Sequence, residues 1–292
     1  MKIIIIIFSL LVSLMMAQVT SDYSYTSADV TATSGAVVAN PGGVWSLYHN
    51  PSGLADIESI SITAGYTNIF NQNFLQFSNS GMVIPIKGFG TFGLSSQSMN
   101  VRYLDTNISS ENVIGLSQGF HLQKDKNSQI NLGYTISYYS VDYGKTAGFS
   151  GDGSDGIEIG NQVAFGLDIG IQAILREKHR VGVYIKNINQ PELNGFALPR
   201  RLDVGLSYTP YKGVVTSLVM EQLFGHPNSQ IKGSIVYDLN NLIVLRVGAQ
   251  SNPNRLGCGF GIKLETFRFD YGFLSHPILP ETHQISLTYL VR

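Results

Sequence analysis

The stretch Gln162-Val-Ala-Phe-Gly-Leu-Asp-Ile-Gly-Ile-Gln-Ala173 decides the fold of this chain. Large apolar side chains occupy every second position from Val163 to Ile171, and the positions between them hold small or polar residues. A period of two is typical of a β-strand, whose successive side chains point to opposite faces. The stretch is long enough to cross a bilayer as a tilted strand, which takes roughly 9–11 residues. It therefore predicts a membrane-spanning strand with one apolar and one polar face.

The same alternation recurs over most of the chain that follows residue 58. Further clear examples are residues 130–138, 202–208, 256–264, 267–273 and 285–291. After residue 16, no stretch is apolar over the roughly 20 residues that a transmembrane helix needs. Only strands closed into a barrel could then cross lipid without leaving backbone groups unpaired. We count about fourteen strands, an even number as in single-chain bacterial barrels.

The composition agrees with a membrane-embedded all-β protein. Only 13% of the 292 residues are charged, against roughly 25% in an ordinary soluble domain. The 31 glycines, 15 tyrosines and 15 phenylalanines favour strands, tight turns and interfacial rings. A net charge of -1 offers no basic stripe for phosphates, so we expect no nucleic-acid partner. The single cysteine, Cys258, cannot form a disulfide within the chain.

Alternation alone would also fit a soluble β-sandwich, whose apolar faces meet in a core. The lengths of the links between strands favour a barrel. Short links are expected at residues 85–88, 122–128, 175–179, 209–213, 238–241 and 264–266. Longer links are expected at residues 101–111, 142–160, 187–199, 222–228 and 274–281, and residues 250–254 break the rule. Short periplasmic turns and long external loops are typical of bacterial outer-membrane barrels, with both chain ends in the periplasm.

The N-terminus predicts export. Lys2 precedes an apolar run, residues 3–16, that ends at the small residue Ala17, as in a cleaved signal peptide. The alternative, a retained anchor, is too short to span a bilayer because Gln18 and Asp22 interrupt the apolar run. We therefore expect a signal peptide at 1–17, an N-terminal segment at 18–58 and an outer-membrane β-barrel at 59–292. The predicted location is the bacterial outer membrane.

The segment 18–58 does not alternate. It holds two turn signals, at residues 40–43 and 49–55, separated by apolar residues such as Trp45 and Leu47. These apolar side chains need cover, which the barrel lumen or its periplasmic mouth offers. The predicted fold class is therefore an all-β transmembrane antiparallel barrel of about fourteen strands, with a short N-terminal segment in the lumen or periplasmic mouth.

Part of this segment resembles a known family. Gly43-Val-Trp-Ser-Leu-Tyr-His-Asn-Pro-Ser-Gly-Leu-Ala55 is similar to a motif of the PorV/PorQ outer-membrane proteins and, more distantly, of the FadL-like fatty-acid channels. Weaker similarity continues downstream at residues 184–188, 198–199, 205–210, 270–273 and 283–287. The chain departs from the family pattern at Ser52, where alanine is usual, and at Asn40, where an acidic residue is common.

The resemblance implies a fourteen-stranded barrel of the FadL type. It marks Asn50, Pro51, Gly53 and Leu54 as candidate residues of a plug. It also implies a non-enzymatic role in protein secretion or surface display, in which members of the type IX secretion system receive or shuttle cargo. Expected partners are outer-membrane lipid, secretion-system subunits and secreted proteins. Two alternatives stay open: a FadL-like transporter of hydrophobic small molecules, and a structural barrel with binding loops.

Charged residues on the presumed inward faces form a second candidate site. They are Asp168, Lys186, Asp203, Lys232, Arg246, Lys263, Arg268 and Asp270. A charge facing lipid costs about 2–4 kcal/mol at the membrane midplane, so we expect these side chains to point into the lumen. Because their signs are mixed, they predict either an internal network that rigidifies the barrel and anchors the N-terminal segment, or the polar lining of a conduit.

Other chemical signals are weak. Residues 88–93 have the glycine spacing of a dinucleotide-binding loop but precede no helical pattern, so they predict the start of a strand. Asp152, Asp155 and Glu158 lie in a glycine-rich loop that could hold calcium, although a solvated external loop is the simpler interpretation. The six histidines show no paired spacing, and no Gly-x-Ser-x-Gly motif occurs. We therefore expect no catalytic residues, no cofactor and no metal site.

Overall fold

The computed structural model describes residues 23–103, 106–146, 148–151, 154–158, 160–193 and 195–291. The predicted signal peptide, residues 1–17, lies outside the described residues. Among the described residues, no helix is long and apolar enough to cross a membrane.

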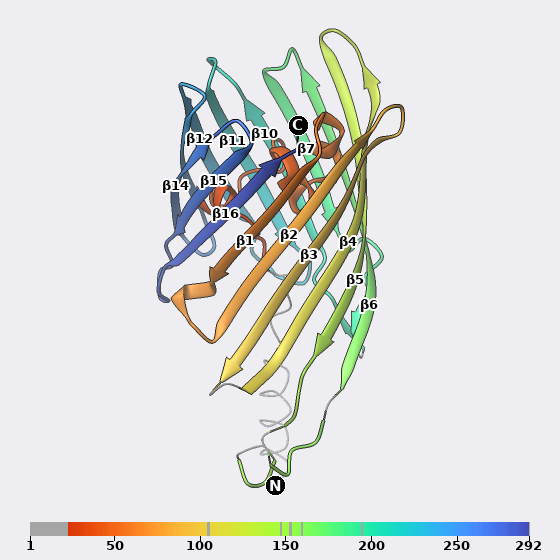
Figure 1. Ribbon diagram of the computed structural model, residues 1–292, viewed down its shortest axis with the longest axis vertical. Helices are drawn as coiled ribbons and strands as arrows, with labels where there is room; N and C mark the ends of the chain where they lie inside the picture. Colours follow the sequence, from red (N-terminus) through yellow and green to blue (C-terminus); the bar gives the residue numbers. More distant parts are fainter. Residues whose placement is uncertain are drawn as a thin grey trace.

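Fourteen antiparallel strands close into one barrel (Figure 1). The strands are β1 Ser61–Asn68, β2 Leu75–Ile86, β3 Gly90–Tyr103, β4 Thr106–Lys124, β5 Ser128–Asp142, β6 Asn161–Leu175, β7 His179–Lys186, β10 Arg201–Tyr208, β11 Val214–Leu223, β12 Gln230–Leu239, β13 Ile243–Gln250, β14 Arg255–Lys263, β15 Phe267–Leu274 and β16 Thr282–Leu290. The barrel closes where Ser61 of β1 lies opposite Leu290 of β16. A separate hairpin, β8 Glu192–Leu193 and β9 Phe196–Ala197, lies between β7 and β10. The predicted fold class is confirmed.

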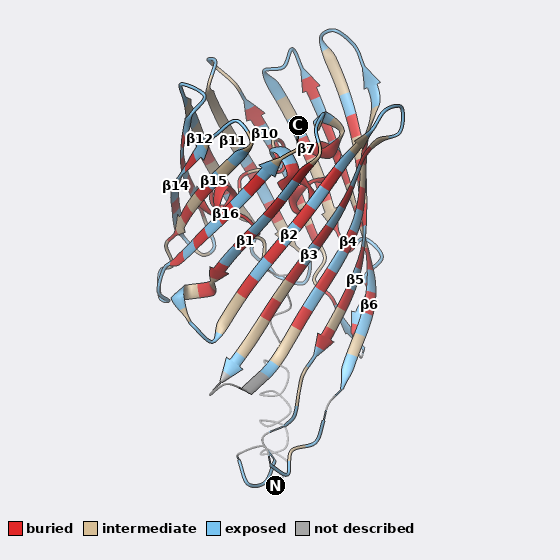
Figure 2. Cartoon of the chain, in the orientation of Figure 1, coloured by how far each residue is buried: buried red, intermediate tan, exposed pale blue. Residues whose placement is uncertain are grey.

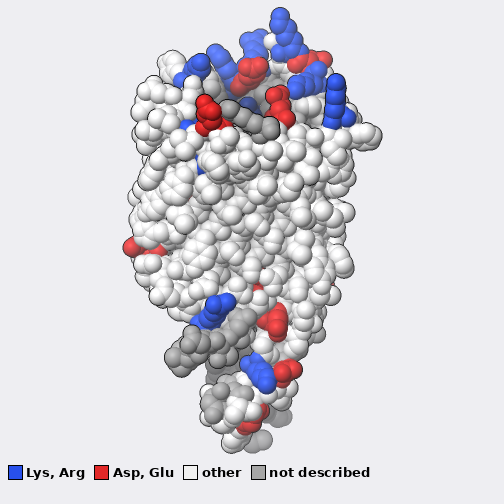
Figure 3. All heavy atoms as spheres, in the orientation of Figure 1, with Lys and Arg blue, Asp and Glu red and all other residues white. Residues whose placement is uncertain are grey.

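The alternation in sequence becomes an alternation of burial. In β6, Val163 and Phe165 are 50% and 62% exposed on the outer wall, whereas Asp168 and Gln172 are buried inside. Figure 2 shows the same change from buried to exposed along each labelled strand. The outer wall carries almost no charge over its middle (Figure 3), as a lipid-facing surface requires.

The six predicted short links form tight turns at one end of the barrel, which we call the short-turn end. The opposite, long-loop end carries the longer links. One prediction was wrong: residues 101–111 are mostly strand, because β3 runs to Tyr103 and β4 starts at Thr106. A register shift after Val101 interrupts the alternation there, and polar outward residues occur beside it, such as Asn100, whose Oδ1 accepts a hydrogen bond from Ser110 Oγ at 3.0 Å. This wall extends further than its neighbours at the long-loop end (Figure 1), so it lacks the apolar face that marks lipid contact.

The N-terminal residues 23–58, which we call the plug, occupy the lumen (Figure 1). They form α2 Ala28–Ala32, η1 Gly43–Trp45, α3 Ser46–His49 and η2 Pro51–Asp56, and a further short helix, η3 Ile69–Asn71, follows β1. The barrel itself begins at Ser61, close to the predicted boundary.

Glycines on the inner wall let the plug lie directly against the strands. A Cβ atom added to Gly170 of β6 would lie 2.0 Å from Asn50 Oδ1, and one on Gly272 of β15 would lie 2.1 Å from the Ala28 carbonyl oxygen. Both separations are too short for any other residue. Further glycines in the same relation to the plug are Gly119, Gly133, Gly182, Gly248 and Gly257.

Candidate functional site

The lumen has a polar half, formed by strands β10 to β16, where charged side chains pair. Lys232 Nζ lies 2.7 Å from Glu221 Oε2, and Arg201 Nε lies 3.2 Å from Asp203 Oδ2 and 3.7 Å from Glu221 Oε2. All four residues are at least nine-tenths buried. Such buried charges are tolerated because each has an opposite charge within hydrogen-bonding reach.

A second cluster joins the wall to the plug. The Asp270 carboxylate lies 2.9 Å from Arg246 Nη2 and 2.8 Å from Arg268 Nε. Arg268 also reaches the plug, where its Nη2 lies 3.5 Å from Asp29 Oδ2. Because Asp29 lies in the first turn of α2, this pair fixes the position of that helix against β15. The contact fits the predicted network that anchors the N-terminal segment.

The remaining predicted charges lie on the same inner wall but outside these two clusters. The Asp168 carboxylate accepts hydrogen bonds from Tyr184 Oη at 3.0 Å and from the Asn187 backbone N–H at 2.7 Å. Lys186 is buried nearby on β7, and Lys263 pairs with Asp238 at the short-turn end. All eight predicted charges therefore occupy inward positions, although they form separate groups.

The prediction missed three charged members of the network, Arg201, Glu221 and Asp29. Arg201 stands two residues before Asp203 and so shares its face, a signal that the period of two contains. Glu221 lies on the inward face of β11, which also carries the buried Val219. Asp29 belongs to the plug, and no pattern in the sequence connects it with Arg268.

The candidate plug residues make one compact turn. Asn50 Oδ1 accepts hydrogen bonds from Ser52 Oγ at 2.6 Å and from the Ser52 backbone N–H at 3.2 Å, and so caps η2. Asn50 Nδ2 donates to the carbonyl oxygen of Val38 at 2.8 Å and, more weakly, to that of Ile171 in β6 at 3.4 Å. Pro51 follows as the first residue of η2, where its fixed φ is favourable. Asn50 thereby connects two parts of the plug with the wall.

The other two motif residues pack the plug against itself. A Cβ on Gly53 would lie 2.5 Å from Pro41 Cγ, so this position requires a close approach. Leu54 is fully buried in a cluster, which we call the plug cluster, with Val44, Trp45, Leu47, Tyr48 and Val83 of β2. The predicted need of this apolar segment for cover is met inside the lumen.

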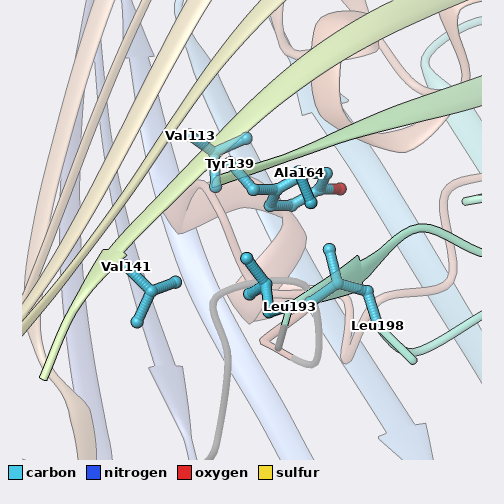
Figure 4. Packing of buried hydrophobic residues seen from close by; sticks show 6 residues of the cluster. All are labelled: Val113, Tyr139, Val141, Ala164, Leu193 and Leu198. Carbon is cyan, nitrogen blue, oxygen red and sulfur yellow. The ribbon is translucent and has the colours of Figure 1, made fainter. Parts of the chain in front are cut away.

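The other half of the lumen, formed by strands β2 to β6, combines polar inward side chains, such as Asn131 and Gln172, with apolar clusters. Near the long-loop end, an entrance cluster gathers six residues, shown in Figure 4: Val113, Tyr139, Val141, Ala164, Leu193 and Leu198. The first four belong to β4, β5 and β6, whereas Leu193 and Leu198 come from the link between β7 and β10. This link therefore folds inward over the wall. This inward fold was not predicted, because the apolar residues of the link, such as Leu193 and Leu198, follow no period.

The entrance cluster and the plug cluster are separated by a short polar stretch. A small cavity of 20 Å³ touches Tyr139 of the entrance cluster and Leu47 and Tyr48 of the plug cluster, and polar side chains such as Gln97 and Asp168 complete its lining. Beyond the plug cluster, a cavity of 490 Å³ is lined by Val44 and Trp45 together with residues of β14 to β16. We call this series of clusters and cavities the apolar track.

A further cavity of 690 Å³ lies beside the β2–β3 turn at the short-turn end. Its lining includes Ala55, Ile57, Phe89, Phe120 and Tyr134. By contrast, the cavities deep in the described lumen measure only 20 and 10 Å³. Such volumes hold about one water molecule. In this structure the plug therefore closes the lumen, and passage of a solute requires the plug to move.

The weak chemical signals of the sequence form no reactive site in the described residues. Residues 88–93 make the β2–β3 turn and the start of β3, with no helix after them. Asp155 accepts hydrogen bonds from Ser150 and Phe149 of its own loop, and the Ser150 bonds lower the pKa of its carboxyl. Glu158 pairs with Lys145 at 3.6 Å, and Asp152 lies outside the described residues. Within the described ranges, no three metal-ligating side chains meet.

The fold and the plugged lumen define the class: this chain is an outer-membrane β-barrel with an N-terminal plug. No protein-family model matches the sequence, and no curated protein matches it significantly. Solved structures do. The CymD monoaromatic hydrocarbon channel matches with a TM-score of 0.66 and 13% identity, over 91% of this chain and 98% of that chain. The Ralstonia pickettii toluene transporter TbuX matches with a TM-score of 0.64 and 12% identity, over 91% and 98%.

A third match is a Pseudomonas aeruginosa FadL homologue, with a TM-score of 0.57, 10% identity and coverage of 90% of this chain and 98% of that chain. At such low identities the similarity shows the fold alone. The chain thus has the fold of the FadL-like outer-membrane barrels.

Proposed function

We propose that this protein transports hydrophobic small molecules across the outer membrane. The apolar track carries the proposal, because its two clusters place apolar surface at the long-loop end and beside the plug within an otherwise polar lumen. Transfer of an uncharged apolar molecule from water to such a surface is favourable, whereas ions and sugars would lose hydrogen bonds to water. The matched structures named as a monoaromatic hydrocarbon channel and a toluene transporter support the same substrate class.

The two halves of the lumen have different tasks in this proposal. The polar half holds α2 through Asp29 and Arg268, so the first part of the plug stays in place. The second part, which contains Trp45 and Tyr48, contacts strands β2 to β6 through buried apolar side chains and through hydrogen bonds, such as that from Tyr48 Oη to the carbonyl oxygen of Ser96 at 3.2 Å. A hydrophobic solute at Leu193 reaches the plug through Tyr139 and competes for these contacts. Movement of the second part of the plug then opens the way to the 490 Å³ cavity.

The entrance cluster supplies the test. Leu193→Asn together with Leu198→Asn places two amides against an apolar wall, where each costs about 1–3 kcal/mol without a partner. We expect uptake of a radiolabelled monoaromatic hydrocarbon by proteoliposomes to fall about tenfold, which corresponds to 1.4 kcal/mol. Ile278→Asn, in the exposed β15–β16 loop, is the matched control and should leave uptake unchanged. Uptake by the double variant at the wild-type rate would overturn the proposal.

Protein secretion is the second candidate function, in the manner of the PorV/PorQ proteins. What favours it is the similarity of residues 43–55, whose Asn50 caps the plug turn and contacts the wall. In that case deletion of the gene leaves surface proteins in the periplasm, and a version carrying Leu193→Asn and Leu198→Asn restores their secretion. Normal secretion in the deletion strain would exclude this candidate without affecting the transport proposal.

A further inference from the structure

The short-turn end carries its positive charge on one side. Six exposed basic residues occupy four turns that follow one another around the barrel wall: Lys87, Lys124, Lys126, Arg176, Lys178 and Lys212. We call them the basic arc. Only two acidic residues, Asp125 and Glu177, lie in the same turns, so their net charge is +4. Figure 3 shows Lys and Arg gathered at this end, above the nearly uncharged wall.

The basic arc is a continuous surface. The Arg176 backbone N–H donates to the Asn127 carbonyl oxygen at 2.7 Å and so joins the β6–β7 turn to the β4–β5 turn. The Thr209 N–H donates to the Lys178 carbonyl oxygen at 2.9 Å and joins the β6–β7 turn to the end of β10. Five of the six cations, all except Lys87, are therefore held on connected backbone rather than on independent loops.

Each of the four turns also presents an exposed apolar side chain next to its cations. These are Phe89, Leu122, Leu175 and Tyr211, whose exposed fractions are 69%, 57%, 51% and 77%. A cation beside an exposed apolar group is typical of a membrane interface, where the charge stays at the headgroup and the apolar part enters the acyl region. Turns that contact only water would not need an exposed apolar side chain beside each cation.

The rest of this rim has a different character. In the β12–β13 and β14–β15 turns, Lys263 is paired with Asp238, and Glu265 adds a negative charge. Asp56 and Glu58, at the end of the plug, lie in or beside the same 490 Å³ cavity as Lys263. The ion pairs found among the described residues involve no member of the basic arc. Its charge is therefore available to an external anion.

We propose that the basic arc binds anionic phospholipid of the periplasmic leaflet. The short-turn end faces the periplasm in a barrel of this type. There, ammonium and guanidinium groups meet the phosphate while Phe89 and Leu175 lie among the first acyl carbons. A net charge of +4 favours a lipid with a net negative charge, such as phosphatidylglycerol, over zwitterionic phosphatidylethanolamine. Lipid bound on one side would fix how the barrel tilts in the membrane.

The test measures the affinity of the full-length protein for lipid by native mass spectrometry in detergent. The two lipids compared are phosphatidylglycerol and phosphatidylethanolamine with the same acyl chains. We expect the wild type to bind phosphatidylglycerol at least tenfold more tightly, because the surface cations attract the net negative charge of this lipid. Replacing all six arc residues by Gln removes this preference. Raising the salt concentration also weakens it, because screening acts on exposed charges.

Two double variants distinguish the effect of the basic arc from that of the total charge of the protein. Lys124→Gln with Lys126→Gln neutralises one turn of the arc and should reduce the preference severalfold. Arg102→Gln with Lys145→Gln removes the same charge at the long-loop end and should leave it unchanged. Equal affinity of the wild type for the two lipids, or an equal loss in the long-loop variant, would overturn the proposal, as would binding of an acidic periplasmic protein at the arc with no lipid preference.

Discussion

The contact between Gly170 and Asn50 allows a direct test of the closed plug. In a Gly170→Ala variant, the new methyl group would lie 2.0 Å from Asn50 Oδ1. Asn50 must then move by about 1.5 Å to reach an ordinary van der Waals separation. That displacement breaks the bonds from Ser52 Oγ at 2.6 Å and from Asn50 Nδ2 to the Val38 carbonyl at 2.8 Å. The barrel wall itself gains only an inward methyl group and should keep its fold.

The magnitude follows from the two lost bonds. A net hydrogen bond is worth about 0.5–1.5 kcal/mol, so the docked plug loses about 1–3 kcal/mol. The fraction of time with the plug displaced should therefore rise roughly 5- to 150-fold.

Planar-bilayer recording measures this fraction as the frequency and duration of conducting events. The matched control is Gly233→Ala, whose Cβ would meet its nearest atom, the Ser217 carbonyl oxygen, at 3.9 Å. Unchanged conductance in Gly170→Ala, or an equal rise in the control, would refute the assignment of this contact to plug closure.

Three further predictions concern the ion pair, the lipid wall and the loop carboxylate. Arg268→Gln removes the cation 3.5 Å from Asp29 and leaves a buried carboxylate short of a partner, so conducting events should become more frequent, and wild-type behaviour would contradict an anchoring role. Leu206→Arg on the outer wall should lower the free energy of unfolding in denaturant titrations by about 2–4 kcal/mol, whereas Tyr211→Arg in a turn should change it little. Because the pKa of Asp155 is lowered, its hydrogen bonds are fully present above the ordinary carboxyl pKa of about 4 and are lost as the pH falls through the lowered value; loss of amide protection in the loop, measured against the intrinsic exchange rate at each pH, would reveal this.

Much of the barrel could be predicted because strand alternation is a local signal. The pattern in residues 162–173 identified β6, and the side that it marked as apolar faces outward. The same rule failed at residues 101–111 because it detects lipid contact rather than the strand itself. There a register shift and polar outward residues interrupt the alternation, and hydrogen bonds such as Ser110 Oγ to Asn100 Oδ1 join the strands.

The candidate site was predicted only in part. The alternation of inward and outward positions placed Asp168 and Asp270 on the inner wall, because a charge on the lipid face is too costly. It could not indicate that Arg246 and Arg268 share Asp270, since the partners come from different strands. The entrance cluster was missed because Leu193 lies in an irregular loop, where no period exists to assign a direction.

By itself, the sequence determined the barrel, the number of its strands and the face of each strand that meets lipid, because these follow from a period of two and from the cost of charge in hydrocarbon. Only the tertiary structure decided what fills the lumen. Asp29 and Arg268 are 239 positions apart in the chain, yet they meet because closure of β1 on β16 curves the wall around the plug. The apolar track likewise exists only once the plug is docked, since its parts come from the plug, the β7–β10 link and the wall of β2 to β6.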